Sequence, residues 1–245
     1  MEIRAVLFDL GNTLMHPVDP DNWPQVLQQG NQALMDYLCE SGLDIDCDSF
    51  ADEFNHRLQN YYSQREILML ETTTFSVLKE LLAKKGFADV SDHMLRAALD
   101  QHYAVTQQNW QLEGDTLACL NALKKGFIKL GIISNAGDDS DVSQLLHKFN
   151  IHHYFEFVLT SAACGYRKPH KRIFELALEN LNFLPEQIAV VGDKLDADIQ
   201  GANQMGMVSI WITRRAAMPP DEELPIHPRA IISTLHDLPS VIFKM

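Results

Sequence analysis

Short apolar segments, separated by stretches with helical periodicity, constrain the fold of this chain most. Residues 3–8 (Ile-Arg-Ala-Val-Leu-Phe) are mostly apolar and end abruptly at Asp9. Similar runs recur further along, at Phe127–Ser134, Phe155–Thr160, Ile188–Gly192, Val208–Thr213 and Ala230–Ser233. Continuous apolar runs are typical of strands buried on both faces of a parallel sheet. Helical patterns such as Lys171–Leu181 lie between them, so the second half predicts an α/β fold with helices on both faces of the sheet.

Residues 16–110 have a different pattern, with helical periodicity and almost no strand signal. Four apolar stripes lie in this region, around Leu34, Phe54, Leu81 and Leu99. We therefore predict a four-helix insert between the first and second strands. The predicted organisation is an α/β core made of 1–15 and 111–245, with a helical domain at 16–110.

Composition limits the partners of the chain. The formal net charge is −13 over 245 residues. This charge argues against nucleic acid or an anionic membrane surface as a main partner, because both reward clustered Lys and Arg. No apolar run approaches the ~20 residues of a membrane span, so we expect a cytoplasmic protein. The four cysteines show no CxxC pair, and we expect four reduced thiols: Cys39, Cys47, Cys119 and Cys164.

Polar side chains follow several of the predicted strands at the point where each strand ends. Asp9 follows the first strand, and Ser134-Asn135 ends the second. Lys168 lies in the loop after the third strand, and Asp193 follows the fourth, with Asp198 close behind. In open parallel sheets, ligands bind beyond the carboxyl ends of the strands. These side chains should therefore meet on one rim.

This combination suits phosphoryl transfer. A carboxylate can attack phosphorus and form a covalent intermediate. Oxygen ligands can hold Mg²⁺, and a hydroxyl, backbone N–H groups and a lysine can bind phosphoryl oxygens. Each residue alone also has a structural interpretation, such as a helix cap for an aspartate or a solvated lysine. The order of all four features along one sheet favours the functional interpretation.

The same residues resemble the four motifs of the haloacid dehalogenase superfamily. Its first motif, D-x-D-x-T after a hydrophobic strand, corresponds to Asp9-Leu10-Gly11-Asn12-Thr13. A strand ending in Ser or Thr corresponds to Ile132-Ile133-Ser134, and a Lys followed by Pro corresponds to Lys168-Pro169. The motif G-D-x-x-x-x-D corresponds to Gly192–Asp198. The resemblance implies a Rossmann-like core, and the helical insert is similar to the α-helical cap of subfamily I.

The resemblance also implies roles around a magnesium ion. Asp9 would be the nucleophile and a metal ligand. The backbone carbonyl of Gly11 and the carboxylate of Asp193 would be further ligands. Asp198 would ligate through water or hold Lys168 in place.

On the phosphate side, the resemblance implies that Ser134 and the Asn135 amide bind the phosphoryl group. Lys168 would neutralise both Asp9 and that group. The implied enzyme is a phosphoric monoester hydrolase, and its partner is a small phosphorylated metabolite. Both a monomer and a homodimer are compatible with the sequence.

Position 11 departs from the family pattern. The usual second aspartate of the first motif is a general acid and base, and here it is Gly11. The enzyme could favour good leaving groups, or a nearby residue could substitute, with His16, Asp19 and Asp21 as candidates. A weakly active or non-catalytic binding protein is the third alternative. A 2-haloacid dehalogenase is a further one, although the G-D-x-x-x-x-D motif favours a metal site.

Overall fold

The computed structural model describes residues 2–217 and 226–245, and its described part divides into two compact units. One unit comprises Met1–His16 and Gln111–Met245, and the other comprises Pro17–Trp110. The predicted loop at Ala217–Pro228 lies largely outside the described residues. No described helix is long and apolar enough to span a membrane.

The first unit contains a six-stranded sheet in which every neighbouring pair is parallel, with the order β5-β4-β1-β6-β7-β8. The strands are β1 (Ala5–Phe8), β4 (Lys129–Ser134), β5 (Phe157–Thr160), β6 (Ile188–Gly192), β7 (Val208–Ile212) and β8 (Ala230–Ile232). All six coincide with apolar runs of the sequence, and the predicted α/β class is confirmed. Two short strands, β2 (Met15–Pro17) and β3 (Trp110–Leu112), form a separate pair that the sequence did not signal.

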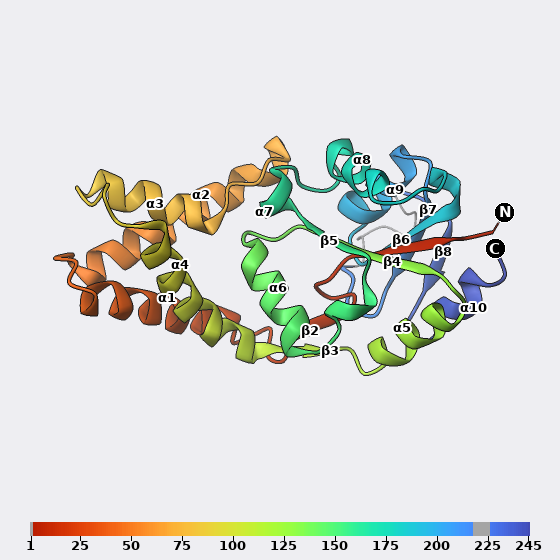
Figure 1. Cartoon of the computed structure of the whole chain (residues 1–245), viewed down its shortest axis with the longest axis horizontal. Helices are drawn as coiled ribbons and strands as arrows, with labels where there is room; N and C mark the ends of the chain where they lie inside the picture. The colour runs from red at the N-terminus through yellow and green to blue at the C-terminus, as the bar shows by residue number, and fades with distance from the viewer. Residues whose placement is uncertain (1, 218–225) are drawn as a thin grey trace. The chain divides into compact units, whose positions relative to one another are not determined.

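Helices cover both faces of the sheet (Figure 1). They are α5 (Thr116–Lys125), α6 (Asp139–Lys148), α7 (Ser161–Cys164), α8 (Lys171–Glu179), α9 (Gln200–Gln204) and α10 (Leu238–Ile242). On one face, α8 and α9 bury Phe174, Ala177 and Ala202 against Leu7 and Val190. On the other face, α5 packs with α10. Burial on both faces explains why the strands read as continuous apolar runs instead of alternating ones.

The second unit is helical. It contains α1 (Trp23–Glu40), α2 (Cys47–Leu68), α3 (Thr74–Lys84) and α4 (Asp92–Thr106). Its core includes Leu34, Phe54, Leu81 and Leu99, one residue from each predicted stripe. The four-helix pattern is therefore present, while the role of this unit as a cap stays a prediction.

One expectation about the cysteines is wrong. Cys119 and Cys164 are free thiols, but Cys39 is disulfide-bonded. The expectation rested on sequence spacing, which does not reveal which cysteines folding brings within bonding distance.

Candidate active site

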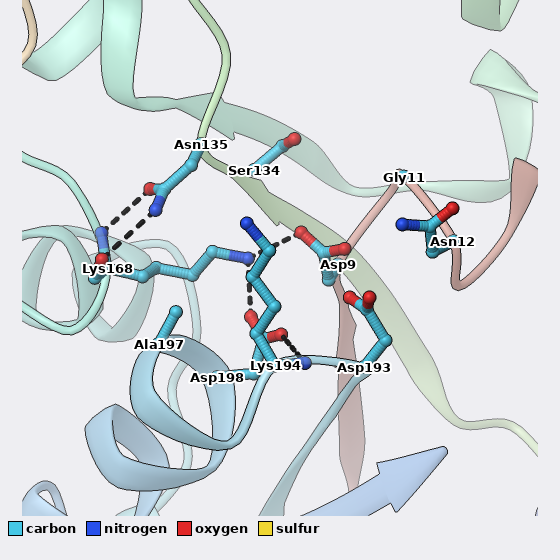
Figure 2. A pocket seen from close by; sticks show the side chains of 10 residues that line it. All are labelled: Asp9, Gly11, Asn12, Ser134, Asn135, Lys168, Asp193, Lys194, Ala197 and Asp198. Atoms are coloured by element: carbon cyan, nitrogen blue, oxygen red, sulfur yellow. Dashed lines mark hydrogen bonds and ion pairs between the residues drawn. The ribbon is translucent and has the colours of Figure 1, made fainter. Parts of the chain in front are cut away.

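A pocket lies at the carboxyl ends of β1, β4 and β6, and all seven predicted site residues line it (Figure 2). The lining residues are Asp9, Gly11, Asn12, Ser134, Asn135, Lys168, Asp193, Lys194, Ala197 and Asp198. The register explains this convergence, because Phe8 of β1 pairs with Ile132 of β4 and Val191 of β6. The residues after these strands must therefore meet on one rim.

Asp9 is fixed by the central strand of the sheet. All four residues of β1 are buried, and β1 has a parallel neighbour on each side. The Asp9 backbone N–H extends the ladder by donating to the Val191 carbonyl at 2.9 Å. The Thr13 hydroxyl lies 3.5 Å from Asp9 Oδ2, the long end of a hydrogen bond. The backbone thus holds Asp9 at the end of β1, where its side chain lines the pocket.

Lys168 is the buried cation of the pocket, with an exposed fraction of 3%. Its Nζ donates to Asp9 Oδ1 at 2.6 Å, Asp198 Oδ1 at 2.6 Å and the Ile133 carbonyl at 2.7 Å. Burial disfavours the charged ammonium, but Asp198 and Asp9 outweigh that effect and raise the Lys168 pKa above its usual value. The lysine therefore stays protonated and connects two carboxylates.

Asn135 holds the backbone of Lys168 in place. The Asn135 side chain accepts from the Lys168 N–H at 2.8 Å and donates to the Lys168 carbonyl at 3.0 Å. This paired contact joins the end of β4 to the loop before α8, as Figure 2 shows. Asn135 therefore has a positioning function that its place beside Ser134 did not reveal. Ser134 itself ends β4 and is 6% exposed.

Asp198 returns to the pocket through η4 (Leu195–Ile199), a short π-helical turn. Its Oδ2 accepts from the Lys194 N–H at 3.0 Å, so both carboxylate oxygens have partners. Gly192 makes room, because a Cβ at this position would lie 2.2 Å from Asp198 Cγ. Burial, opposed by Lys168, raises the Asp198 pKa to about 6. Asp198 is thus a buried carboxylate committed to Lys168.

Asp193 is the carboxylate without a cation of its own. It is 6% exposed, and within the described chain no hydrogen bond reaches its carboxylate. Trp211 Nε1 donates to its backbone carbonyl at 2.8 Å, which fixes the residue at the end of β6. Burial, together with repulsion from Asp9 and Asp198, raises the Asp193 pKa to about 7.

The three aspartates together fit a divalent cation. Asp9, Asp193 and Asp198 each present an oxygen, and these oxygens lie within 4.8 Å of one another. Figure 2 shows the Asp9 and Asp193 carboxylates directed toward the same space. Carboxylate oxygens are ligands that Mg²⁺ prefers, and a cation here would relieve the repulsion that raises the Asp193 pKa.

Asn12, Lys194 and Ala197 also line the pocket, and sequence analysis did not single them out. Asn12 adopts φ = 60°, a left-handed conformation that Asn tolerates better than most residues. Lys194 is exposed, and its charge opposes the rise in the Asp193 pKa. The only sequence signal for Asn12 and Lys194 was their position beside Gly11 and Asp193.

The three residues proposed to replace the acid at position 11 have different outcomes. His16 does not line the pocket; its Nε2 lies 3.7 Å from Glu113 Oε1, and the residue is 8% exposed. Asp19 and Asp21 belong to the helical unit and are exposed. They stay predictions.

Comparison with known proteins decides the family. The profile of the haloacid dehalogenase-like hydrolases matches residues 3–206. The chain belongs to this family. It is 28% identical to a glyceraldehyde 3-phosphate phosphatase of Methanopyrus kandleri over 212 residues, which is 86% of this chain and 84% of that protein. A ribulose-1,5-bisphosphate 5-phosphatase of Halopiger xanaduensis is also 28% identical, over 84% of this chain and 83% of the relative.

Comparison with solved structures gives the same family. The crystal structure of a 2-haloacid dehalogenase from Pseudomonas syringae superposes with a TM-score of 0.70 and 25% identity, covering 99% of each chain. The family resemblance predicted from the four motifs is thus confirmed. Within this family, enzymes named as phosphatases and as dehalogenases both resemble the chain, so the chemistry has to be argued from the pocket.

Proposed function

We propose that this haloacid dehalogenase-like hydrolase is a Mg²⁺-dependent phosphatase that hydrolyses a small phosphorylated metabolite through an aspartyl-phosphate at Asp9. One observation carries the proposal. Three carboxylates, Asp9, Asp193 and Asp198, lie within 4.8 Å of one another beside the buried Lys168. Such a cluster has more negative charge than its own buried cation balances, which is the condition for binding a divalent metal.

Asp9, the Gly11 carbonyl and Asp193 would hold the metal. Asp198 is a supporting residue, because its two oxygens already accept from Lys168 Nζ and the Lys194 N–H. When bound, Mg²⁺ would shield the repulsion between the Asp9 carboxylate and the phosphate dianion. Gly11 contributes through its backbone, so the lack of a side chain does not remove this ligand.

The remaining groups would bind the phosphoryl oxygens. Ser134 offers a hydroxyl from the end of β4, and Asn135 offers its backbone amide. Lys168 shares its charge between Asp9 and the incoming phosphate. Hydrogen-bond donors fixed in this way stabilise the charge that develops during phosphoryl transfer without reorganising.

The named relatives support the enzyme class, a phosphoric monoester hydrolase. The proteins from Methanopyrus kandleri and Halopiger xanaduensis are each named for the removal of phosphate from a small phosphorylated sugar. Their similarity extends over more than four fifths of this chain, so it includes the helical unit as well as the α/β unit. The individual substrate is not transferred from them.

A 2-haloacid dehalogenase is the second candidate, favoured by the similarity to the Pseudomonas syringae enzyme. That chemistry also uses an aspartate nucleophile, which attacks carbon and needs no metal. Under a dehalogenase function, the buried Asp193 would remain an uncompensated charge, because no hydrogen bond reaches its carboxylate in the described chain. A metal-dependent phosphatase explains this residue and a dehalogenase does not.

The test is a panel of phosphorylated metabolites, assayed for phosphate release with and without Mg²⁺. We expect release that requires Mg²⁺ and is lost in Asp9→Asn, a variant that keeps the shape of the side chain while removing its nucleophilic charge. Asp196→Asn is the matched control. Asp196 is an exposed carboxylate of the same η4 turn that does not line the pocket, so its loss should leave the rate unchanged.

Two results would contradict the proposal. Release of chloride from 2-chloropropionate without metal, dependent on Asp9, would establish the dehalogenase. Silence across the panel, with Mg²⁺ still binding, would favour a non-catalytic binding protein.

A further inference from the structure

The absence of an acidic side chain at position 11 bears on which phosphates the pocket can cleave. In the first half-reaction, a carboxylate oxygen of Asp9 forms a bond to phosphorus, and the bond to the leaving oxygen breaks. The bonding pair departs with that oxygen, which becomes an anion unless a proton reaches it. General acid catalysis typically contributes about 10²–10⁴-fold to such a step. The chemistry of the leaving group therefore decides whether a missing acid matters.

The backbone does not impose glycine at this position. Within the described chain, the glycines with positive φ are Gly42, Gly86, Gly165 and Gly206. Gly11 is outside that group, so its backbone is one that a residue with a side chain can adopt. The φ angle of this turn therefore does not require glycine at position 11.

The other carboxylates of the pocket are already committed. Both oxygens of Asp198 accept hydrogen bonds, from Lys168 Nζ and from the Lys194 N–H. Asp9 is the nucleophile, and Asp193 is the carboxylate left for the metal. In the described residues that line the pocket, no fourth carboxylate and no histidine is present. His16 is held next to Glu113 instead.

The two lysines are poor substitutes for the missing acid. The Nζ of Lys168 donates to three acceptors, so giving up a proton would break an arrangement of two ion pairs. Lys194 is exposed, so its charge is screened by solvent. Lys194 can still attract an anion electrostatically, because its side chain lines the pocket beside Lys168 and Asp198 (Figure 2).

Resting on the proposed phosphatase function, we propose that the substrates are phosphates with an acidic leaving group, such as acyl, enol or aryl phosphates, and not ordinary alkyl monoesters. These leaving oxygens depart as stable anions without a proton. The conjugate acid of a carboxylate has a pKa of about 4 and that of a phenolate about 10, against about 16 for water. This class differs from the sugar phosphates in the names of the relatives.

The residue at position 11 also affects the second half-reaction. A water molecule attacks the phosphorus of the aspartyl-phosphate, and the bond from phosphorus to the Asp9 oxygen breaks, which restores the Asp9 carboxylate. The attacking water gives up a proton, which the second aspartate of the family motif would accept as a base and which here must pass to solvent. With Gly11 in that position, this hydrolysis should be slow relative to the first step for good leaving groups. Phosphorylated Asp9 should then accumulate during turnover.

The experiment compares kcat/KM for p-nitrophenyl phosphate, phenyl phosphate and glycerol phosphate in wild type, Gly11→Asp and Gly11→Asn. In wild type we expect kcat/KM to fall by at least about 10²-fold from the nitrophenyl to the glycerol ester. Gly11→Asp should raise the rate on glycerol phosphate by about 10²-fold, so that kcat/KM depends less on the acidity of the leaving group. Gly11→Asn has the shape of Asp but no carboxyl group, so kcat/KM should still depend steeply on the acidity of the leaving group.

Acid-quenched intact mass spectrometry of wild type with p-nitrophenyl phosphate supplies a readout other than rate. Accumulated phosphoprotein that is absent from Asp9→Asn supports the inference, and its absence from wild type overturns it. A wild-type rate on glycerol phosphate within tenfold of that on the nitrophenyl ester also overturns it. If Gly11→Asp does not fold, the wild-type measurements alone still test the inference about the leaving group. Failure of the phosphatase proposal is distinguishable, because no ester would then release phosphate in an Asp9-dependent way.

Discussion

Two ionic clusters of the α/β unit, each built around buried carboxylates, differ in how their charges are balanced. Among the described residues that line the pocket, Lys168 is the one buried cation, and it faces Asp9, Asp193 and Asp198. Directly after β3 in the chain, Glu113 accepts from both Arg214 and Arg215, and Arg214 also pairs with Asp115. The first cluster has excess negative charge, and we call it the open cluster. In the second, Arg214 and Arg215 balance the charges of Glu113 and Asp115, and we call it the closed cluster.

The carboxylate pKa values of the two clusters shift in opposite directions. Burial disfavours the Glu113 charge, but hydrogen bonds from Arg215 and Arg214 outweigh it and lower the Glu113 pKa. In the pocket, burial and carboxylate repulsion raise the Asp193 pKa to about 7. A closed cluster stabilises the fold, whereas an open one lowers stability until a ligand supplies the missing charge. The comparison therefore separates a structural network from a functional one.

The largest effect is expected for Lys168→Met. This variant leaves the pocket carboxylates without their buried cation, and removing one partner of a buried ion pair costs about 3–5 kcal/mol. We expect the free energy of unfolding to fall by about 4 kcal/mol, measured by urea denaturation at pH 8 without metal. Lys171→Met, at an exposed position of α8, is the control. A loss below about 1 kcal/mol for Lys168→Met would show that the cluster is not held by this lysine.

Glu113→Gln tests the closed cluster. Glu113 is 5% exposed, and the glutamine amide removes the negative charge that Arg214 and Arg215 share and one of its two acceptor oxygens. We expect a loss of about 3 kcal/mol, because Arg214 is half-buried and Arg215 is exposed, so both recover part of their hydration. Phosphatase activity per folded molecule should stay unchanged, since Glu113 does not line the pocket. Unchanged stability would remove the distinction between the two clusters.

Asp193→Asn should raise the free energy of unfolding, whereas the two preceding variants should lower it. The pKa of Asp193 is raised in the folded protein from its ordinary value of 3.8 to about 7, so the folded state binds the extra proton between these values. The stability of metal-free wild type therefore falls as pH rises through this window. We expect Asp193→Asn to be more stable by about 2 kcal/mol at pH 8 and equal to wild type near pH 4. Thermal unfolding across pH in EDTA measures this difference, and a destabilised variant at pH 8 would contradict it.

Lys194→Met should have the smallest effect. The Lys194 charge lowers the Asp193 pKa, so its removal should shift the pH midpoint of Mg²⁺ binding upward. Because Lys194 is exposed, the shift should be only a few tenths of a pH unit and should shrink at high salt. Mg²⁺ titrations at several pH values measure it. A downward shift would mean that Lys194 acts on the site in another way.

Much of the fold and the rim of the pocket could be predicted from the sequence. Buried parallel strands leave continuous apolar runs, and the residue after each run must lie at the carboxyl edge. Asp9, Ser134 and Asp193 follow from this rule alone. Lys168 was also placed on this rim, as a residue of the loop after the third strand, but its burial could not be predicted because a lysine in a loop carries no local signal of burial.

The closed cluster could not be predicted in this way. Glu113 and Arg214 are 101 residues apart, and neither belongs to a motif. The path of Asp198 was also hidden, since a π-helical turn that returns its side chain to Lys168 looks in sequence like an ordinary helix start. Lys194 and Asn12 enter the pocket through local backbone geometry, which apolar periodicity does not report.

Calorimetric titration of Mg²⁺ at pH 6.5 tests most directly whether a divalent cation completes the open cluster. We predict one Mg²⁺ per chain, with protons released on binding because the metal displaces the proton that Asp193 holds near this pH. Asp193→Asn should abolish binding, while Glu113→Gln should bind as wild type does. Equal binding by wild type and Asp193→Asn would contradict the claim.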